Sequence, residues 1–362
     1  MNNNQVRGAA VVAAAAIALS ALAACSIADQ KQSSASNDAS QGTVTVITHD
    51  SFSLSDDAIA EFEKVSGYKL QTTAPGDAGT MTKQLLLTAD SSDIDAVYGI
   101  DNLSAGELSA AGILGRAVSD QVWGDDGDAP VLTEDVYATK DGGTLIPIDR
   151  GDVCMNIDNA WFDDTGTAKP ETFDDLLKPE LKGKTVVTNP ASSSPGLAML
   201  AGTQALYGDS WLDYWKSLLD NNAKVDAGWS DAYEVDFSAG GGEGAYPIVL
   251  SYASSPAFSG GATSSVDATC VPQIEYAGVL KNSSNPEGAQ AFVDFMLSKK
   301  VQAEIPNSMY MYPVREGVEV PSEWAQYAKL PAASISVDAD VINQNRDSWL
   351  KEWQAMFESH EK

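Results

Sequence analysis

From residue 43 onward, hydrophobic and polar positions follow two different patterns. Runs of alternating or continuous β-branched residues predict strands, and apolar residues three or four positions apart predict helices. The strand-like runs are 43–48, 68–72, 94–98, 144–157, 184–188, 223–226, 248–252 and 271–279. The helix-like runs are 55–67, 81–87, 103–111, 195–206, 211–219, 286–296 and 338–359. Strands therefore alternate with helices, which predicts an α/β fold with a mostly parallel sheet covered by helices on both faces.

Two of the predicted helices have especially clear signals. The first begins after Ser55, a residue that caps helices, and ends at Gly67. Its predicted apolar face consists of Ile59, Phe62 and Val65. The last helix carries aromatic residues at spacings of four, namely Trp349, Trp353 and Phe357.

The length of the chain and its two longest extended runs predict two lobes. Residues 43–362 are too many for one ordinary core. The extended runs 144–157 and 271–279 are long enough to serve as paired strands of a hinge. We expect lobe I to comprise residues 43–149 and 275–362, and lobe II to comprise residues 150–274.

The first 42 residues predict export rather than folding. A cationic start with Arg7 precedes an apolar run from Ala9 to Ala24, and Leu22-Ala23-Ala24-Cys25 resembles a lipobox. A retained transmembrane helix is the alternative, but the apolar run is shorter than the ~20 residues that a bilayer core requires. We therefore expect a signal peptide at residues 1–24, a lipid on Cys25 and a flexible linker at residues 25–42. The protein would lie on the extracellular face of the cell membrane, contacting the membrane through its lipid anchor only.

The charge of the chain restricts its partners. The formal net charge is −29, and it becomes −30 without the predicted leader, which contains one arginine. Such a field repels phosphate backbones, so we expect no nucleic-acid partner, and it favours the approach of a cation. Acidic surfaces also keep exported proteins soluble, which is an equally good explanation of the charge.

Two cysteines remain if Cys25 carries a lipid. Cys154 and Cys270 lie in strand-like segments, and in an oxidising compartment such a pair is expected to form a disulfide. Two cysteines and two histidines without close spacing supply no tetrahedral metal site, and we expect neither a metal nor a cofactor.

Candidate ligand-binding residues gather in the loops after the predicted strands, where open α/β sheets bind ligands. Aromatic faces attract a delocalised cation, each with on the order of 0.5–2 kcal/mol, although a single Trp or Tyr more often packs in a core. The aromatic candidates are Trp229, Tyr233, Tyr252 and Tyr310. The carboxylates of Asp50 and Asp101 could add a charge opposite to that of the ligand or accept hydrogen bonds from its amino groups. Their polar neighbours His49 and Asn102 are candidates as well.

A serine loop precedes one predicted helix. Ser192, Ser193 and Ser194 come directly before Pro195, a residue that suits a helix start. The free amides of that helix could hold a phosphate or a carboxylate, or the serines could simply cap it.

A secreted hydrolase is the alternative from a different functional class. His49 is the sole histidine inside the predicted folded body, and the chain has no Gly-x-Ser-x-Gly elbow. Carboxylate-pair chemistry stays open, because acidic residues are numerous. Binding is the better-supported function, and we expect no enzyme activity.

At these loops the chain resembles the thiamine-binding proteins of ABC transporters, within the type II periplasmic solute-binding proteins. The segments that carry the resemblance are Asp50-Ser51-Phe52, Gly99-Ile100-Asp101-Asn102, Ser194-Pro195-Gly196-Leu197, Gly228-Trp229-Ser230-Asp231-Ala232-Tyr233, Leu250-Ser251-Tyr252, Ser255-Pro256-Ala257 and Met311-Tyr312-Pro313-Val314. The resemblance implies a two-lobed receptor that closes on thiamine or its phosphates and delivers them to a membrane permease. It also implies that Trp229, Tyr252 and Tyr310 surround the thiamine rings, that Asp50 and Asp101 face the polar ring atoms or the cationic side, and that the serine loop meets the hydroxyl or phosphate end.

The chain also departs from that family. His49 and Phe258 stand where the family has tyrosines, and Tyr310 stands where a tryptophan is expected. A related pyrimidine or another organic cation is therefore an alternative ligand. Ferric-ion receptors of the same group are a further alternative, and they use adjacent tyrosines. Here Met311 separates Tyr310 from Tyr312, so in extended backbone the two side chains should diverge.

Overall fold

The computed structural model describes residues 41–119, 122, 136–241 and 244–360. The predicted signal peptide, Cys25 and the predicted linker up to residue 40 lie outside the described residues. Within those ranges, no helix combines the length and the apolar character needed to cross a membrane.

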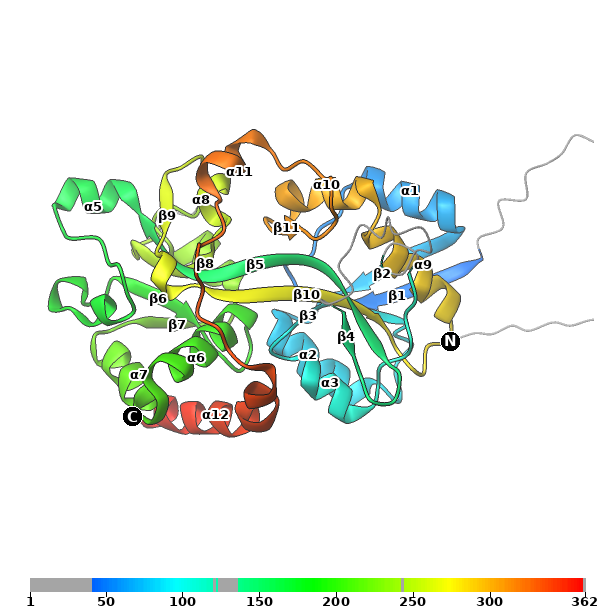
Figure 1. The fold of residues 1–362 in the computed structure, drawn as a ribbon, viewed down its shortest axis with the longest axis horizontal. Coiled ribbons are helices and arrows are strands. Elements are labelled where there is room, and N and C mark those ends of the chain that lie inside the picture. The colour runs from blue at the N-terminus through cyan, green and yellow to red at the C-terminus, as the bar shows by residue number, and fades with distance from the viewer. Residues whose placement is uncertain (1–40, 120–121, 123–135, 242–243, 361–362) are drawn as a thin grey trace, which may run out of the picture. The chain divides into compact units, whose positions relative to one another are not determined.

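The described strands form one mixed sheet (Figure 1). Its main path runs in the order β2 (Tyr68–Thr73), β1 (Gly42–Ile47), β3 (Ala96–Asp101), β10 (Val271–Val279), β5 (Thr144–Asp158), β8 (Ile248–Tyr252), β6 (Thr185–Thr188) and β7 (Lys224–Asp226). Three short strands pair with β5, namely β4 (Tyr137–Ala138), β9 (Thr263–Ser265) and β11 (Tyr312–Pro313). The predicted α/β class is confirmed.

Two long strands link the flanks of this sheet. β1 pairs in parallel with β2 and β3 on one flank, and β6 pairs in parallel with β7 and β8 on the other. Between the flanks, β5 and β10 pair antiparallel with each other, from Val153 opposite Val271 to Leu145 opposite Gly278 (Figure 1). The two extended runs recognised in the sequence are therefore side by side.

A disulfide joins Cys154 to Cys270 at one end of this strand pair. The pairing of Val153 with Val271 places the two cysteines next to each other, and both are fully buried. The bond predicted from the cysteine count is present in the structure.

Helices α1 (Asp56–Ser66), α2 (Ala78–Thr88), α3 (Ala105–Ala111), α9 (Pro286–Met296) and α10 (Lys299–Ser308) accompany the β1 flank. The Ser55 Oγ accepts the Ala58 N–H at 3.1 Å, and Gly67 ends α1 with a left-handed φ of 74°, as its position predicts. Phe62 packs on Phe292 and Phe295 of α9. Val65 was predicted on the same apolar face, but its side chain is 65% exposed, and Ala58 is buried in its place.

The other flank carries α5 (Asn159–Thr165), α6 (Ser194–Tyr207), α7 (Trp211–Asp220) and α12 (Ala339–His360). Trp353 of α12 meets Trp215 of α7 edge to face, with ring centroids 5.5 Å apart, and stacks on Phe357. The aromatic face predicted for the last helix thus finds its partners on α7. This packing attaches α12 to the segment predicted as lobe II, although the sequence-based boundaries put residues 338–359 in lobe I.

Several short helices and turns were not predicted from the sequence. They are α8 (Ser255–Phe258), α11 (Ser322–Tyr327), a π-helical turn at Asp231–Asp236, and 3₁₀ turns at Asp174–Leu177, Pro179–Leu181, Gly208–Ser210 and Asp267–Thr269. α5 and α10 were missed as well. The seven residues of α5 span about two turns, which is too short for a clear apolar period.

Candidate ligand-binding pocket

A pocket of about 570 Å³, counted with its opening to solvent, collects side chains from both flanks of the sheet. Its lining residues are His49, Ser51, Asp77, Ala78, Ser194, Trp229, Tyr233, Tyr252, Ser255, Phe258, Glu275, Met309, Tyr310 and Met311. Six of the predicted ligand-binding residues are among them, namely His49, Ser194, Trp229, Tyr233, Tyr252 and Tyr310. Most of the lining residues lie at strand ends or helix starts, where the polypeptide changes direction.

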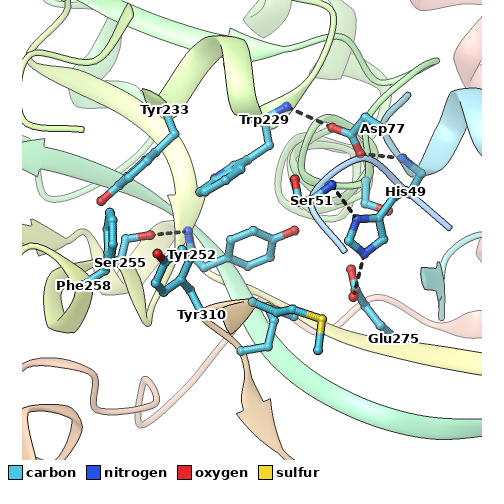
Figure 2. Close-up of a pocket in the computed structure, with 14 residues that line it drawn as sticks. His49, Ser51, Asp77, Trp229, Tyr233, Tyr252, Ser255, Phe258, Glu275 and Tyr310 are labelled. Carbon is cyan, nitrogen blue, oxygen red and sulfur yellow. Dashed lines mark hydrogen bonds and ion pairs between the residues drawn. The ribbon is translucent and has the colours of Figure 1, made fainter. Parts of the chain in front are cut away.

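Stacked aromatic rings form one wall of the pocket. The Trp229 and Tyr233 rings are nearly parallel, with centroids 5.0 Å apart and an interplanar angle of 11°, and the Tyr252 ring lies 6.4 Å from Trp229. Trp229 Nε1 donates to Ser251 Oγ at 2.8 Å, which fixes the orientation of the indole. Figure 2 shows these rings on one side of the pocket and the His49–Glu275 pair on the other.

A second aromatic pair borders the pocket. The rings of Phe258 and Tyr310 are 4.1 Å apart. Tyr310 has a left-handed φ of 57°, which a non-glycine residue seldom adopts and which costs about 1–2 kcal/mol. Its neighbours therefore hold Tyr310 in an unfavourable backbone conformation, a situation common at functional sites.

His49 and Glu275 form a buried hydrogen-bonded pair, which becomes an ion pair when His49 is protonated. His49 Nε2 lies 3.3 Å from Glu275 Oε2, and the Ser51 N–H donates to His49 Nδ1 at 3.2 Å. Burial alone would lower the pKa of His49, but the charge and hydrogen bond of Glu275 outweigh burial and raise it. Burial would raise the pKa of Glu275, but the same pairing holds it below its usual value. Glu275 is therefore an ionised carboxylate in the pocket.

Behind this pair lies a second buried acid, Asp149. Tyr98 donates its hydroxyl to Asp149 and also lies within 3.2 Å of Glu275 Oε2. Burial and the nearby Glu275 charge raise the pKa of Asp149 well above its usual value. The cluster thus holds one ionised and one neutral carboxyl, as expected when two acids share a site.

Asp77 supplies the other carboxylate of the pocket. It caps α2, accepting the Ala78 N–H at 2.6 Å with Oδ1 and the Trp229 N–H at 2.9 Å with Oδ2 (Figure 2). Burial raises the pKa of Asp77, and the Ser193 hydroxyl together with these two N–H donors opposes that shift. Asp77 connects the start of α2 directly to the aromatic wall.

The remaining predicted residues lie outside the lining. Asp50 is exposed, and Asn102 hydrogen-bonds to the backbone of Ile274. Asp101 is buried, where it accepts the N–H groups of Leu103 and Ser104 and the Ser194 hydroxyl. Ser192 donates to the Ala227 carbonyl, and Ser193 is buried at the start of α6. The structure thus uses Asp101 and the serine loop to hold adjacent segments together.

Sequence reasoning missed both pocket carboxylates. Asp77 follows a Pro-Gly pair and precedes α2, so a helix-capping signal was available, but the helix was predicted to begin only at residue 81. Glu275 lies inside the long run 271–279, where one charged residue among buried neighbours was the available signal.

The hydrogen-bond partners of His49 test the hydrolase alternative. Both ring nitrogens already have partners, Glu275 at Nε2 and the Ser51 N–H at Nδ1. In the described part of the chain, neither hydrogen bond of His49 is to a serine hydroxyl, so the geometry gives no serine–histidine pair.

Two α/β flanks linked by long antiparallel strands, with a pocket lined from both, define the type II periplasmic-binding-protein-like fold. The sequence profile described as "Bacterial extracellular solute-binding protein" matches residues 108–345. The chain therefore belongs to this family of solute-binding proteins.

Individual relatives agree with that assignment. The thiamine-binding periplasmic protein of Salmonella typhimurium is 27% identical over 322 residues, which cover 86% of this chain and 92% of the relative. A solved structure named periplasmic thiamin binding protein superposes with a TM-score of 0.73 at 25% identity, over 87% of this chain and 96% of that one. The iron uptake protein A2 of Synechocystis is 28% identical over 191 residues, which cover 48% of this chain and 55% of the relative. The resemblance stated from the loop residues is confirmed.

Proposed function

We propose that this protein captures thiamine, or one of its phosphates, as the substrate-binding component of an ABC importer. The observation that carries the proposal is a pocket in which the rings of Trp229, Tyr233 and Tyr252 share the lining with the carboxyl groups of Asp77 and Glu275. Flat aromatic faces and carboxylates together suit a positively charged heteroaromatic molecule. The names of the relatives identify such a molecule, thiamine.

The proposed capture uses two lobes joined by β5 and β10. In this view α12 moves with α7, and the remaining boundaries follow the sequence prediction. Closure would hold the Trp229 wall, whose N–H already donates to Asp77, opposite Glu275, and a permease would recognise the closed form. We propose further that Cys25 carries the lipid that keeps the protein at the outer face of the cell membrane.

The tyrosines argue against a ferric-ion receptor. Tyr310 lines the pocket, but Tyr312 packs edge to face on Trp324 and donates its hydroxyl to the Ala328 carbonyl. Two tyrosines that coordinate one ion must converge on it, and these two diverge. Among the described residues, no cluster of three His, Cys, Asp or Glu side chains could hold a metal ion.

Replacing the aromatic wall tests the proposal. We expect Trp229→Ala and Tyr252→Ala each to weaken thiamine binding at least about tenfold in titration calorimetry, because each removes a ring face next to the ligand. Trp161→Ala is the matched control, since Trp161 packs on Phe162 away from the pocket. Circular dichroism should report an unchanged fold for all three variants. Unchanged thiamine affinity in both wall variants would remove the proposed site.

A further inference from the structure

We infer that the pocket selects thiamine itself, the unphosphorylated cation, and discriminates against thiamine phosphates. This inference rests on the proposed function and makes its substrate class narrower. Three observations support it: the charges of the lining, the state of its hydrogen-bond donors, and the packing of the serine loop.

The charged residues of the lining are His49, Asp77 and Glu275. His49 is hydrogen-bonded to Glu275, so the lining holds two carboxyl groups and one imidazole that is a cation only when protonated. Within the described ranges, neither lysine nor arginine lines the pocket, and the undescribed internal segments 120–121, 123–135 and 242–243 contain neither residue in their sequence. A bound phosphate would therefore face carboxylates without a lysine or arginine beside it, which costs binding free energy.

Three N–H groups beside the pocket already have acceptors within the protein. The Ala78 and Trp229 N–H groups both donate to Asp77, and the Ser51 N–H donates to His49. Phosphate-binding sites instead direct such groups at the ligand. The Ser194 hydroxyl likewise donates to Asp101. These four donors are therefore directed at Asp77, His49 and Asp101 rather than into the pocket.

The serine loop, which the resemblance assigns to the phosphate end, packs against α2 at Ser192. The Thr80 N–H of α2 donates to the Ser192 carbonyl at 3.2 Å. A Cβ placed on Gly79 would come within 2.7 Å of the Ser192 carbonyl carbon, so the two backbones are in direct contact there. A phosphate at Ser192 would require α2 to move away.

The basic residues near this loop face elsewhere. Lys83 donates to the Ala191 carbonyl, and Arg346 pairs with Glu107. Both line a separate groove beside α12 that shares no lining residue with the pocket. Substitution of Lys83 therefore tests whether a phosphate binds in that groove.

Titration calorimetry of the full folded chain with thiamine, thiamine monophosphate and thiamine diphosphate tests the inference. We expect the dissociation constant to rise at least about tenfold from thiamine to the diphosphate, since the added charges meet carboxylates. Glu275→Gln and Asp77→Asn should weaken thiamine binding and bring the three ligands within about threefold of one another. Asp163→Asn removes an exposed carboxylate outside the pocket and should change none of the three affinities.

The outcomes separate this inference from the proposed function. If the wild-type protein binds all three ligands with equal affinity, or prefers the diphosphate, thiamine capture stands and the inference is overturned. A loss of diphosphate binding alone in Lys83→Gln would overturn it too, since the groove would then hold the phosphate. If none of the three ligands binds, the proposed function fails and this inference falls with it. If the pocket variants unfold, the wild-type protein still provides a test. The ratio of its dissociation constants for the diphosphate and for thiamine should fall at high salt, because salt screens the repulsion between phosphate and carboxylates.

Discussion

Glu275 is the residue on which the pocket chemistry depends most. It lies on β10, its carboxylate reaches the pocket, and His49, Tyr98 and Gln273 all donate hydrogen bonds to it. Its fixed negative charge can stabilise either the proton on His49 or a cationic ligand. A proton and the ligand therefore compete for one carboxylate.

This competition predicts a pH dependence of binding. The pKa of His49 is raised above 6.5, and the charges facing the ring are those of Glu275, Asp77 and Asp50. As the pH rises through this pKa, His49 loses its charge, so the affinity for thiamine should increase, by about three- to tenfold. Calorimetry between pH 6 and pH 8.5 measures the slope, which His49→Gln should abolish. An unchanged slope in His49→Gln would assign the effect to another group.

Asp149 provides a test of the buried acid cluster through stability. Folding raises the pKa of Asp149, so its protonated form is favoured in the folded protein and its contribution to stability is lost as the pH rises through that pKa. Asp149→Asn removes this loss and keeps an acceptor for Tyr98. Chemical denaturation should show the variant gaining stability relative to wild type from pH 5 to pH 8. A relative loss over that range would contradict the assignment of a neutral Asp149.

At the residue scale, the sequence revealed the aromatic side of the pocket better than the charged side. Trp229 and Tyr252 were identifiable because loops after strands are where ligands bind. Asp101 was predicted to contact the ligand, but its carboxylate accepts the N–H groups of Leu103 and Ser104 instead. A sequence pattern does not distinguish a carboxylate that caps backbone N–H groups from one that contacts a ligand. Glu275 reaches the pocket only through the register of β10 against β5, which depends on the whole sheet.

At the element scale, α12 shows how a helix of clear amphipathic pattern finds an unexpected partner. Trp353 is fully buried against Trp215, and Arg346 near the start of α12 pairs with Glu107 of α3. The aromatic spacing predicted the helix and its apolar face. The surface that this face covers could not be predicted, because α7 and α12 lie more than 100 residues apart in the sequence and a helical pattern carries no information on its partner.

The packing of α12 yields a stability prediction. Trp353→Ala should lower the free energy of unfolding by about 3–5 kcal/mol, since it opens a cavity between α12 and α7. Gln354→Ala is the matched control, because that side chain is exposed and alanine suits a helix. Urea denaturation of both variants provides the comparison. A change below about 1 kcal/mol for Trp353→Ala would show that α12 contributes little to the fold.

At the scale of the whole molecule, contacts across the pocket link its two sides. Asp77 accepts the Trp229 N–H, Asp101 accepts the Ser194 hydroxyl, and Ser51 Oγ lies 3.4 Å from Ser230 Oγ. These bonds join segments that only the β5–β10 pair connects through the sheet. In our account, a ligand held between the rings and the carboxylates adds to the same set of contacts and favours closure.

The alternation of strands and helices predicted the fold class, and the two long extended runs predicted the strand pair that links the flanks. The lobe boundaries from sequence stay a prediction that the position of α12 modifies. What a linear pattern could not supply is the meeting of loops from opposite flanks, because that depends on how β5 and β10 set the two sides against each other.

A crystal structure of the protein with thiamine bound would show whether the ligand lies between the aromatic rings and the carboxyl groups. We predict that the thiamine rings lie against Trp229 and Tyr252, with the positively charged ring within about 6 Å of an aromatic face and directed toward Glu275 or Asp77. Thiamine located elsewhere on the protein, with this pocket filled only by water, would contradict it.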